Sequence, residues 1–172
     1  MPVTVRVAVA DDAQHLPAIE ASAALAFGCI DELSWVAQSP PMSVERHRQL
    51  IALSTCWVAL DDESAPQGFL SAERYGDALH IHEVSVALLW QGQGLGRRLI
   101  EVAQAHARSN GLRQVTLTTF IDVPWNAPFY ARMGFQVQAS QHLEPRLAAL
   151  LSGEYQRGYA PGSRCVMVWS VT

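Results

Sequence analysis

Apolar residues along this chain alternate with a period of two in some stretches and recur at helical spacing in others, which predicts strands interleaved with helices. Residues 3–9 alternate around β-branched side chains and predict a first strand. Asp11 or Asp12 is expected to cap a helix that follows and runs to about Phe27. Residues 28–41 lose the pattern, which predicts a loop or an irregular helical connection.

Along the rest of the chain, segments with strand periodicity again alternate with segments of helical periodicity. A short helix is expected to begin near Ser43 and run to Leu53, before a hairpin of two strands. The predicted strands are residues 55–60, 68–75, 78–88, 114–120, 135–139 and 165–171; the later predicted helices are residues 94–110, a short segment that ends at Gly134 and, as an alternative to a loop, residues 144–151. This order predicts an α/β fold with one mixed central β-sheet flanked by helices.

The strand over residues 78–88 has an irregular apolar pattern. Leu79 and Ile81 lie on one face, whereas from Val84 onward the apolar side chains occupy the other parity. One extra residue in the strand would produce this switch, so a β-bulge near Glu83 is expected. A strand buried on both faces would give the same pattern, and the residues alone leave both interpretations open.

A glycine-rich turn connects this strand to the next helix. It reads Gln91, Gly92, Gln93, Gly94, Leu95, Gly96, Arg97 and Arg98. The first N–H groups of a helix lack intrahelical partners and carry partial positive charge, so the turn is suited to bind a phosphate. Two arginines in the first helical turn oppose the helix dipole, a cost that a bound anion would remove. Simple solvation of both side chains is the alternative.

Two common phosphate-binding motifs do not fit this turn. The dinucleotide fingerprint G-x-G-x-x-G requires a third glycine where the chain has Arg97 or Leu99, depending on the starting glycine. The loop that binds nucleoside triphosphates requires a Gly-Lys pair, and the chain contains none. The sequence therefore excludes both classes.

The pattern that does fit is Q/R-x-x-G-x-G/A, supplied by Gln91, Gly94 and Gly96. It resembles the pyrophosphate-binding motif of the GCN5-related N-acetyltransferases, the GNAT family. In that family the motif follows a bulged strand whose backbone hydrogen-bonds to the pantetheine arm of acetyl-CoA, and residues 84–86 occupy the matching position. The resemblance implies the GNAT acyl-CoA N-acyltransferase fold. Leu88 stands where many members have proline.

A second segment, residues 126–135, resembles the family block N-x-x-A/S-x-x-F/Y-Y-x-x-x-G-F, loosely in its first half. Locally it predicts a short helix that Asp122 or Asn126 caps and Gly134 ends. By resemblance, Asn126 would hold the pantetheine arm and Tyr130 would place its hydroxyl near the coenzyme sulfur. The coenzyme-binding residues that both motifs imply are Val84, Ser85, Val86, Gln91, Gly92, Gln93, Gly94, Leu95, Gly96, Arg97, Asn126 and Phe129.

Acetyl transfer to an amine requires a proton acceptor, because an amine with a pKa near ~10 is almost fully protonated at neutral pH. Glu83 is the candidate general base, directly or through a water. Tyr130 is the candidate general acid for the departing thiolate, and the backbone N–H near Val86 is a candidate for stabilising the oxyanion. The alternatives are a rim carboxylate without catalytic duty and a solvent-facing aromatic. No serine or cysteine has a nucleophile signature, so direct transfer is expected.

The acceptor is the least determined part of the reaction. His80 and His82 lie two residues apart and would line the acceptor pocket or relay a proton. Because two histidines without a third ligand make a weak metal site, no metal is expected. By resemblance, the first two helices and their connection contribute to acceptor binding. The pocket residues expected there are Phe27, Asp31, Glu32 and Trp35, although a solvated loop with an anchoring tryptophan is an equal alternative.

Composition narrows the classes of partner. The 172 residues carry a formal net charge of −4 without a basic stripe, which argues against nucleic-acid binding. Three cysteines without C-x-x-C spacing support neither a disulfide framework nor a zinc knuckle. The absence of a recognisable leader and of a long apolar run favours a cytoplasmic protein with no membrane partner. Charged residues make up only 16% against a usual ~25%, which is compatible with a homodimer.

These features predict one GNAT domain over residues 1–172, an acetyl-CoA-dependent N-acetyltransferase. The expected acceptor is the primary amine of a small molecule, with amino acids, polyamines, antibiotics and peptide amines left open. Two alternatives from other classes are a non-catalytic acyl-CoA sensor on the same fold and an interaction module whose glycine turn is only structural.

Overall fold

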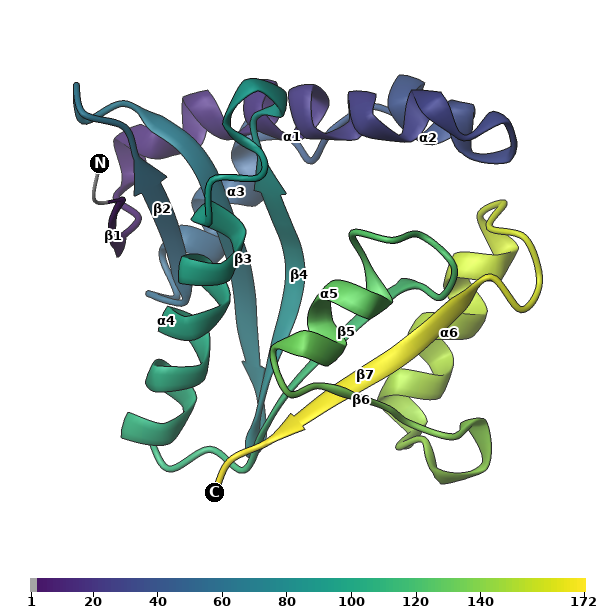
Figure 1. Ribbon diagram of the computed structural model, residues 1–172. Helices are drawn as coiled ribbons and strands as arrows, with labels where there is room; N and C mark the ends of the chain where they lie inside the picture. The colour runs from purple at the N-terminus through teal and green to yellow at the C-terminus, as the bar shows by residue number, and fades with distance from the viewer. Residues whose placement is uncertain (1–2) are drawn as a thin grey trace. The chain divides into compact units, whose positions relative to one another are not determined.

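The computed structural model describes residues 3–172 (Figure 1). Within this range the strands are β1 (Thr4–Val7), β2 (Cys56–Leu60), β3 (Pro66–Tyr75), β4 (Ala78–Val86), β5 (Gln114–Phe120), β6 (Gln136–Val137) and β7 (Arg164–Ser170). The α-helices are α1 (Leu16–Ala24), α2 (Ser34–Gln38), α3 (Val44–Ile51), α4 (Leu95–Ser109), α5 (Ala127–Arg132) and α6 (Pro145–Gln156). Short 3-10 helices cover Ala10–His15, Leu25–Cys29, Asp31–Leu33, Leu88–Trp90 and Ser140–His142.

The predicted order of strands and helices is confirmed, but the first helix begins differently. Asp11 and Asp12 lie inside the 3-10 helix that precedes α1, so the prediction that either caps α1 is wrong. The carboxylate of Asp12 instead accepts a hydrogen bond from the N–H of Val9 at 2.7 Å. At α3 the expected cap is present, because Ser43 Oγ accepts from the N–H of Arg46 at 3.1 Å.

The structure defines the secondary structure of three regions that the sequence left open or placed only approximately. Residues 28–41 form the irregular helical connection, with a 3-10 turn and α2. Residues 144–151 are helical and belong to the longer α6. The strand predicted over residues 78–88 ends at Val86, and a 3-10 turn begins at Leu88. The β-bulge near Glu83 stays a prediction.

The seven strands within residues 3–172 form one mixed sheet in the order β1-β2-β3-β4-β5-β7-β6. β4 and β5 run parallel and pair over Ala78 to His80, whereas the pairs β1–β2, β2–β3, β5–β7 and β6–β7 are antiparallel. A parallel pair requires a crossover connection, and α4 supplies it. The glycine turn therefore follows the carboxyl end of a parallel strand, which is where open α/β sheets commonly bind ligands.

The described residues divide into two compact units. The first contains the chain up to Arg74 together with Ile81–Ala105, and the second contains Tyr75–His80 and the chain from His106 onward. Both β4 and α4 contribute residues to each unit.

In the first unit, helices cover both faces of β2 and β3. The core on one face consists of Ala8, Ala13, Leu16, Ile19, Leu50, Ile51, Cys56, Val58, Leu60 and Phe69. Gly68 precedes Phe69 and faces the other way, where a side chain in its place would contact Leu99 of α4. Alternation along β3 therefore places α3 and α4 on opposite faces of these strands, as Figure 1 shows.

His47 is a polar residue inside this otherwise apolar core. It is fully buried, and its ring meets the ring of Phe69 edge-on with 5.1 Å between centroids. Within residues 3–172, neither ring nitrogen of His47 has a hydrogen-bond partner. Burial lowers the pKa of His47, because a charged imidazole in this position would lose its hydration without gaining a partner. The folded protein therefore contains the neutral ring.

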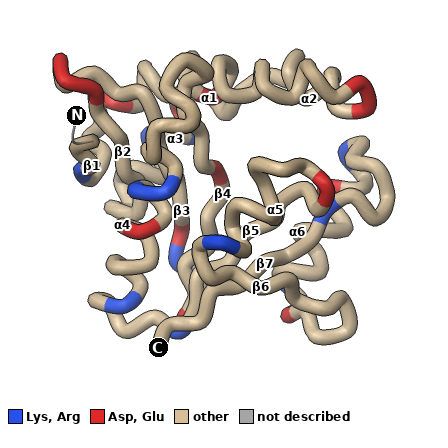
Figure 2. The backbone as a smooth tube through the Cα atoms, viewed as in Figure 1, with Lys and Arg blue, Asp and Glu red and all other residues tan. Residues whose placement is uncertain are grey.

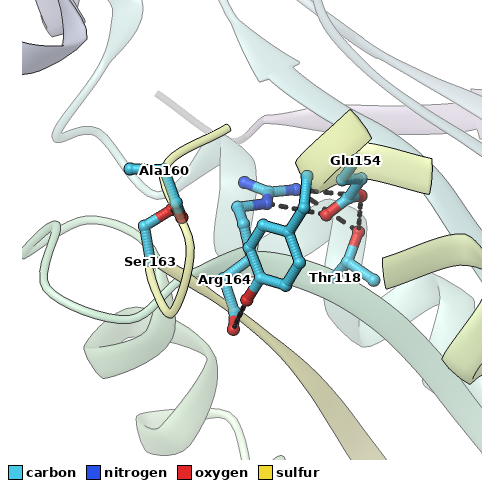
Figure 3. A network of polar contacts seen from close by, with 6 residues as sticks. Thr118, Glu154, Ala160, Ser163 and Arg164 are labelled. Atoms are coloured by element: carbon cyan, nitrogen blue, oxygen red, sulfur yellow. Dashed lines mark hydrogen bonds and ion pairs between the residues drawn. The ribbon is translucent and has the colours of Figure 1, made fainter. Parts of the chain in front are cut away.

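The second unit contains a buried ion pair between β7 and α6 (Figure 3). Arg164 Nε and Glu154 Oε1 lie 2.8 Å apart, and both side chains are about nine-tenths buried. Thr118 Oγ1 donates to Glu154 Oε2 at 2.7 Å, and the guanidinium lies over the rings of Phe120 and Tyr159 at 4.5 and 4.6 Å. Both charges therefore have close partners, as buried charges require, and this network joins β5, α6 and β7.

We predict that His47 makes the stability of the protein fall in mild acid. Its folded-state pKa is lowered, so below about pH 6.5 the unfolded chain binds a proton that the folded protein does not. The free energy of unfolding should then drop with falling pH, by at most about 1.4 kcal/mol per pH unit from this group, until the folded-state pKa is reached. Urea denaturation between pH 5 and 7.5 should show a shallower drop for His47→Leu. His142→Gln, at an exposed position, is the control, and parallel curves for His47→Leu and the unaltered protein would contradict the prediction.

Candidate active site

Glu83, the candidate base, lies in the second half of β4 with a half-buried side chain. Its Oε1 accepts a hydrogen bond from Ser85 Oγ at 2.9 Å. Ser85 itself is buried, whereas Val84 and Val86 are half-buried. A carboxylate that is partly withdrawn from water and oriented by a neighbouring hydroxyl is a suitable proton acceptor.

His82, which precedes Glu83 in the sequence, forms a polar contact with Glu73. His82 Nε2 and Glu73 Oε2 lie 2.9 Å apart, and both side chains are half-buried. Arg46 of α3 approaches the same carboxylate oxygen at 3.6 Å. The contact with the carboxylate orients the imidazole of His82.

His80 has a different environment from His82, although the sequence groups the two. It is 2% exposed, and its Nδ1 lies 2.8 Å from Thr116 Oγ1 on β5. Tyr75 contacts the His80 ring edge-on with 6.2 Å between centroids. His80 belongs to the second unit and His82 to the first, so each histidine is held by its own set of neighbours.

A glycine in β3 permits close packing against the end of β4. A Cβ added at Gly68 would lie 3.3 Å from the backbone oxygen of Ser85 and 3.3 Å from Val86 Cγ2. Both distances are tighter than ordinary van der Waals contact. The missing side chain therefore lets β3 support the backbone that the resemblance assigns to coenzyme binding.

Two glycines of the glycine turn have left-handed backbone conformations. Gly92 and Gly94 have φ of +77° and +88°, in the left-handed region that favours glycine. Arg98 donates the first helical hydrogen bond to Gly94 O at 3.1 Å. The N–H groups of residues 95–97 precede that bond and open the helix without intrahelical partners, the arrangement that binds phosphate.

Side chains of the turn brace its backbone. Gln91 Nε2 donates to Val86 O at 2.9 Å, and Gln93 Nε2 donates to Leu89 O at 3.2 Å. Arg97, a predicted coenzyme-binding residue, is exposed and forms an ion pair with Glu101 at 3.0 Å. This pair offsets part of the repulsion between the arginine and the helix dipole.

The second family block forms α5 in the second unit. Asn126 is the N-cap residue of α5, although its side chain makes no capping hydrogen bond. Phe129 and Tyr130 contact each other with 5.2 Å between ring centroids, and Tyr130 contacts Phe135 at 5.8 Å. Gly134, with φ of +93°, ends the helical segment as expected. The aromatic contacts hold the half-buried ring of Tyr130 in place.

The residues expected to bind the acceptor lie on the helical connection after α1. Asp31 and Glu32 are exposed in the 3-10 turn before α2, which Figure 2 marks in red. Trp35 is 38% exposed, and Phe27 is half-buried. The connection therefore combines accessible carboxylates with aromatic surface.

Glu20 and Glu73 received no role from the sequence. Burial raises the pKa of the Glu20 carboxyl, even though the N–H of Met42 donates to it at 2.7 Å. Neither residue belongs to a recognisable motif. Their positions depend on contacts with distant segments, so no local signal marks them.

Two further expectations concern metals and membranes. Within residues 3–172 no group of three or more histidine, cysteine or acidic side chains is arranged to hold a metal ion. In the same range, no helix has both the length and the apolar composition needed to cross a bilayer.

Comparison with known proteins identifies the family. Residues 52–137, half of the chain, match the family described as the acetyltransferase (GNAT) domain. The chain therefore belongs to the GNAT acetyltransferase family. The relative N-alpha-acetyltransferase 80 from Mus musculus is 33% identical over 92 residues, which make up 51% of this chain. That alignment covers 28% of the length of the mouse protein.

Solved structures confirm the predicted fold. PaiA N-acetyltransferase from Thermoplasma acidophilum, in complex with coenzyme A, matches with a TM-score of 0.72 and 15% identity over 99% of both chains. N-acetylglutamate synthase from Neisseria gonorrhoeae, complexed with coenzyme A and N-acetyl-glutamate, matches with a TM-score of 0.71 and 19% identity. That match covers all of this chain and 36% of the synthase chain. At these identities the likeness establishes the GNAT fold alone.

We predict that the turn depends on the left-handed conformation of Gly94. Gly94→Ala should lower the free energy of unfolding by about 1–2 kcal/mol, because a Cβ disfavours a positive φ even where space is open. Gly28→Ala is the matched control, since Gly28 also has open space around it but no positive φ. Urea denaturation measures both variants. Equal effects of the two substitutions would contradict the prediction.

Proposed function

We propose that this chain acts as a single-domain N-acetyltransferase that moves an acetyl group from acetyl-CoA directly to a primary amine. The observation that carries the proposal is the glycine turn at the carboxyl end of β4, whose open N–H groups begin α4 in a chain of the GNAT family. The turn suits the pyrophosphate of the coenzyme. The PaiA and N-acetylglutamate synthase structures, both described as containing coenzyme A, support this assignment.

The proposed chemistry assigns one proton transfer to each of two side chains. Glu83 takes one proton from the ammonium group of the acceptor. The neutral amine nitrogen then attacks the thioester carbonyl carbon and releases its second proton to solvent. The carbon–sulfur bond then breaks, and Tyr130 donates a proton to the thiolate. Because a thiol has a pKa of only about 8.5, this second transfer contributes less than the first.

The proposed acceptor is a small molecule with a cationic amine. Asp31 and Glu32 supply negative charge on the connection after α1, and Trp35 supplies aromatic surface that attracts cations. The names of similar proteins point to more than one acceptor class, since one structure contains N-acetyl-glutamate and the mouse relative is an N-alpha-acetyltransferase. A panel of polyamines, amino acids and short peptides covers both classes. The cytoplasmic location and the homodimer stay predictions.

Coenzyme binding is tested by thermal unfolding. A ligand that binds only the folded state at 100 times its Kd stabilises by about 2.7 kcal/mol, or roughly 5–10 °C for a chain of this size. Acetyl-CoA and CoA should both raise the Tm, whereas NADH at the same concentration should not. An unchanged Tm with both coenzymes would sink the proposed function and favour the interaction-module alternative.

Catalytic roles are tested by separating turnover from binding. Glu83→Gln should lower kcat/KM by about 10²–10⁴-fold near neutral pH with an unchanged Kd for CoA, because it removes a proton acceptor. The loss should shrink at higher pH as more amine becomes unprotonated. Tyr130→Phe should slow the reaction by about tenfold or less.

The exposed Glu63→Gln is the control for loss of one carboxylate. Full activity of Glu83→Gln would remove Glu83 from the mechanism. Coenzyme binding without turnover of any amine in the unaltered protein would support the acyl-CoA sensor instead.

A further inference from the structure

The chain leaves β4 through a short passage in which successive backbone groups have partners. Ala87 N–H donates to Gln67 O at 2.8 Å, and Trp90 N–H donates to Ala87 O at 2.8 Å. Between them, Leu88 is the first residue of a 3-10 turn, a position whose N–H has no partner within the turn. That N–H donates to Ser22 Oγ of α1 at 2.9 Å, across 66 positions of sequence.

Position 88 opens a 3-10 turn, and the first position of a helical turn is one where proline occurs. Ala87 has φ of −51° and ψ of 139°, and this ψ lies in the range that a residue before proline adopts. Such a first position tolerates proline because an N–H there is not needed. Leu88 retains that N–H in this chain, and α1 supplies its acceptor.

Leu88 also connects its hydrogen bond with Ser22 to the glycine turn. Its backbone oxygen accepts from Gln91 N–H at 3.3 Å, and the Gln91 side chain reaches back to Val86 O. The route from Ser22 through Leu88 to Gln91 therefore consists of hydrogen bonds, and Gln91 begins the motif that opens α4. Because Leu88 is 41% exposed, water can replace the hydroxyl chemically but cannot hold the backbone against α1.

We infer that Ser22 is a positioning residue for the coenzyme-binding turn, which its hydroxyl ties to α1 through the N–H of Leu88. The inference rests on the proposed function, because it assumes that the turn holds the coenzyme. Ser22 contacts neither coenzyme nor acceptor in this role. It fixes the backbone from which the open N–H groups of α4 project.

The first test compares coenzyme affinity and turnover in Ser22→Ala. The Kd for CoA and the KM for acetyl-CoA should rise about two- to tenfold, the effect of one lost hydrogen bond, while kcat at saturating coenzyme stays within twofold. Alanine favours helix more than serine does, so weaker binding would not come from a weakened α1. Ser22→Thr retains the hydroxyl and should restore the affinity. Ser152→Ala, the same exchange at an exposed position of α6, is the control.

The decisive test is a double-mutant cycle with Leu88→Pro. Proline removes the N–H that Ser22 serves, so Ser22→Ala should have no further effect on the Kd for CoA in that background. An equal loss of affinity in both backgrounds would overturn the proposal, as would an unchanged Kd in Ser22→Ala alone. If Leu88→Pro does not fold, amide hydrogen exchange at Leu88 replaces the cycle: Ser22→Ala should speed exchange there and Ser22→Thr should not, and equal rates would overturn the link.

Failure of this inference is distinguishable from failure of the proposed function. If the unaltered protein binds CoA and Ser22→Ala binds it with the same Kd, only the role of Ser22 is overturned. Absence of CoA binding in the unaltered protein overturns the proposed function and, with it, the coenzyme-positioning role, even where exchange at Leu88 confirms the hydrogen bond.

Discussion

The candidate site depends on how backbone N–H groups are satisfied where β4 passes into α4. Each such group must find an acceptor or remain open to solvent or ligand. Ser22 accepts from the N–H of Leu88, and Gly94 accepts the first helical bond. Left-handed glycines then turn the chain so that the remaining N–H groups open the helix together. The coenzyme site proposed here would therefore rest on backbone N–H groups more than on basic side chains.

Each of the two units contains buried polar groups, and the two sets differ in how their polar atoms are satisfied. In the first unit, His47 sits in the core without a hydrogen-bond partner for its ring, so burial keeps it neutral. In the second unit, Arg164 and Glu154 remain paired because each meets the other and further neighbours. A neutral ring tolerates an apolar core, whereas a charge does not.

Membership of the GNAT family indicates acetyl transfer as the class of reaction. The contacts around Glu83 show how the proposed general base is oriented. The carboxylate is oriented by Ser85 and follows His82, whose ring meets Glu73. His80, two residues earlier, is buried against Thr116. Neighbouring residues of β4 therefore have different hydrogen-bond partners. The connection after α1, where acceptor binding is proposed, belongs to the more variable type of segment.

The sequence by itself determined the order of elements, the glycine turn and the α5 block, because each is encoded by local periodicity or by residues with restricted backbone geometry. Gln91, Gly94 and Gly96 mark the turn through their resemblance to the family motif. Tertiary structure decided the rest. The carboxylate of Asp12 accepts a hydrogen bond from the N–H of Val9 and does not cap α1. His80 contacts Thr116, whereas His82 contacts Glu73. Ser22 reached Leu88 from 66 residues away. Such hydrogen bonds depend on which distant segments fold against each other, and no local pattern of residues records that choice.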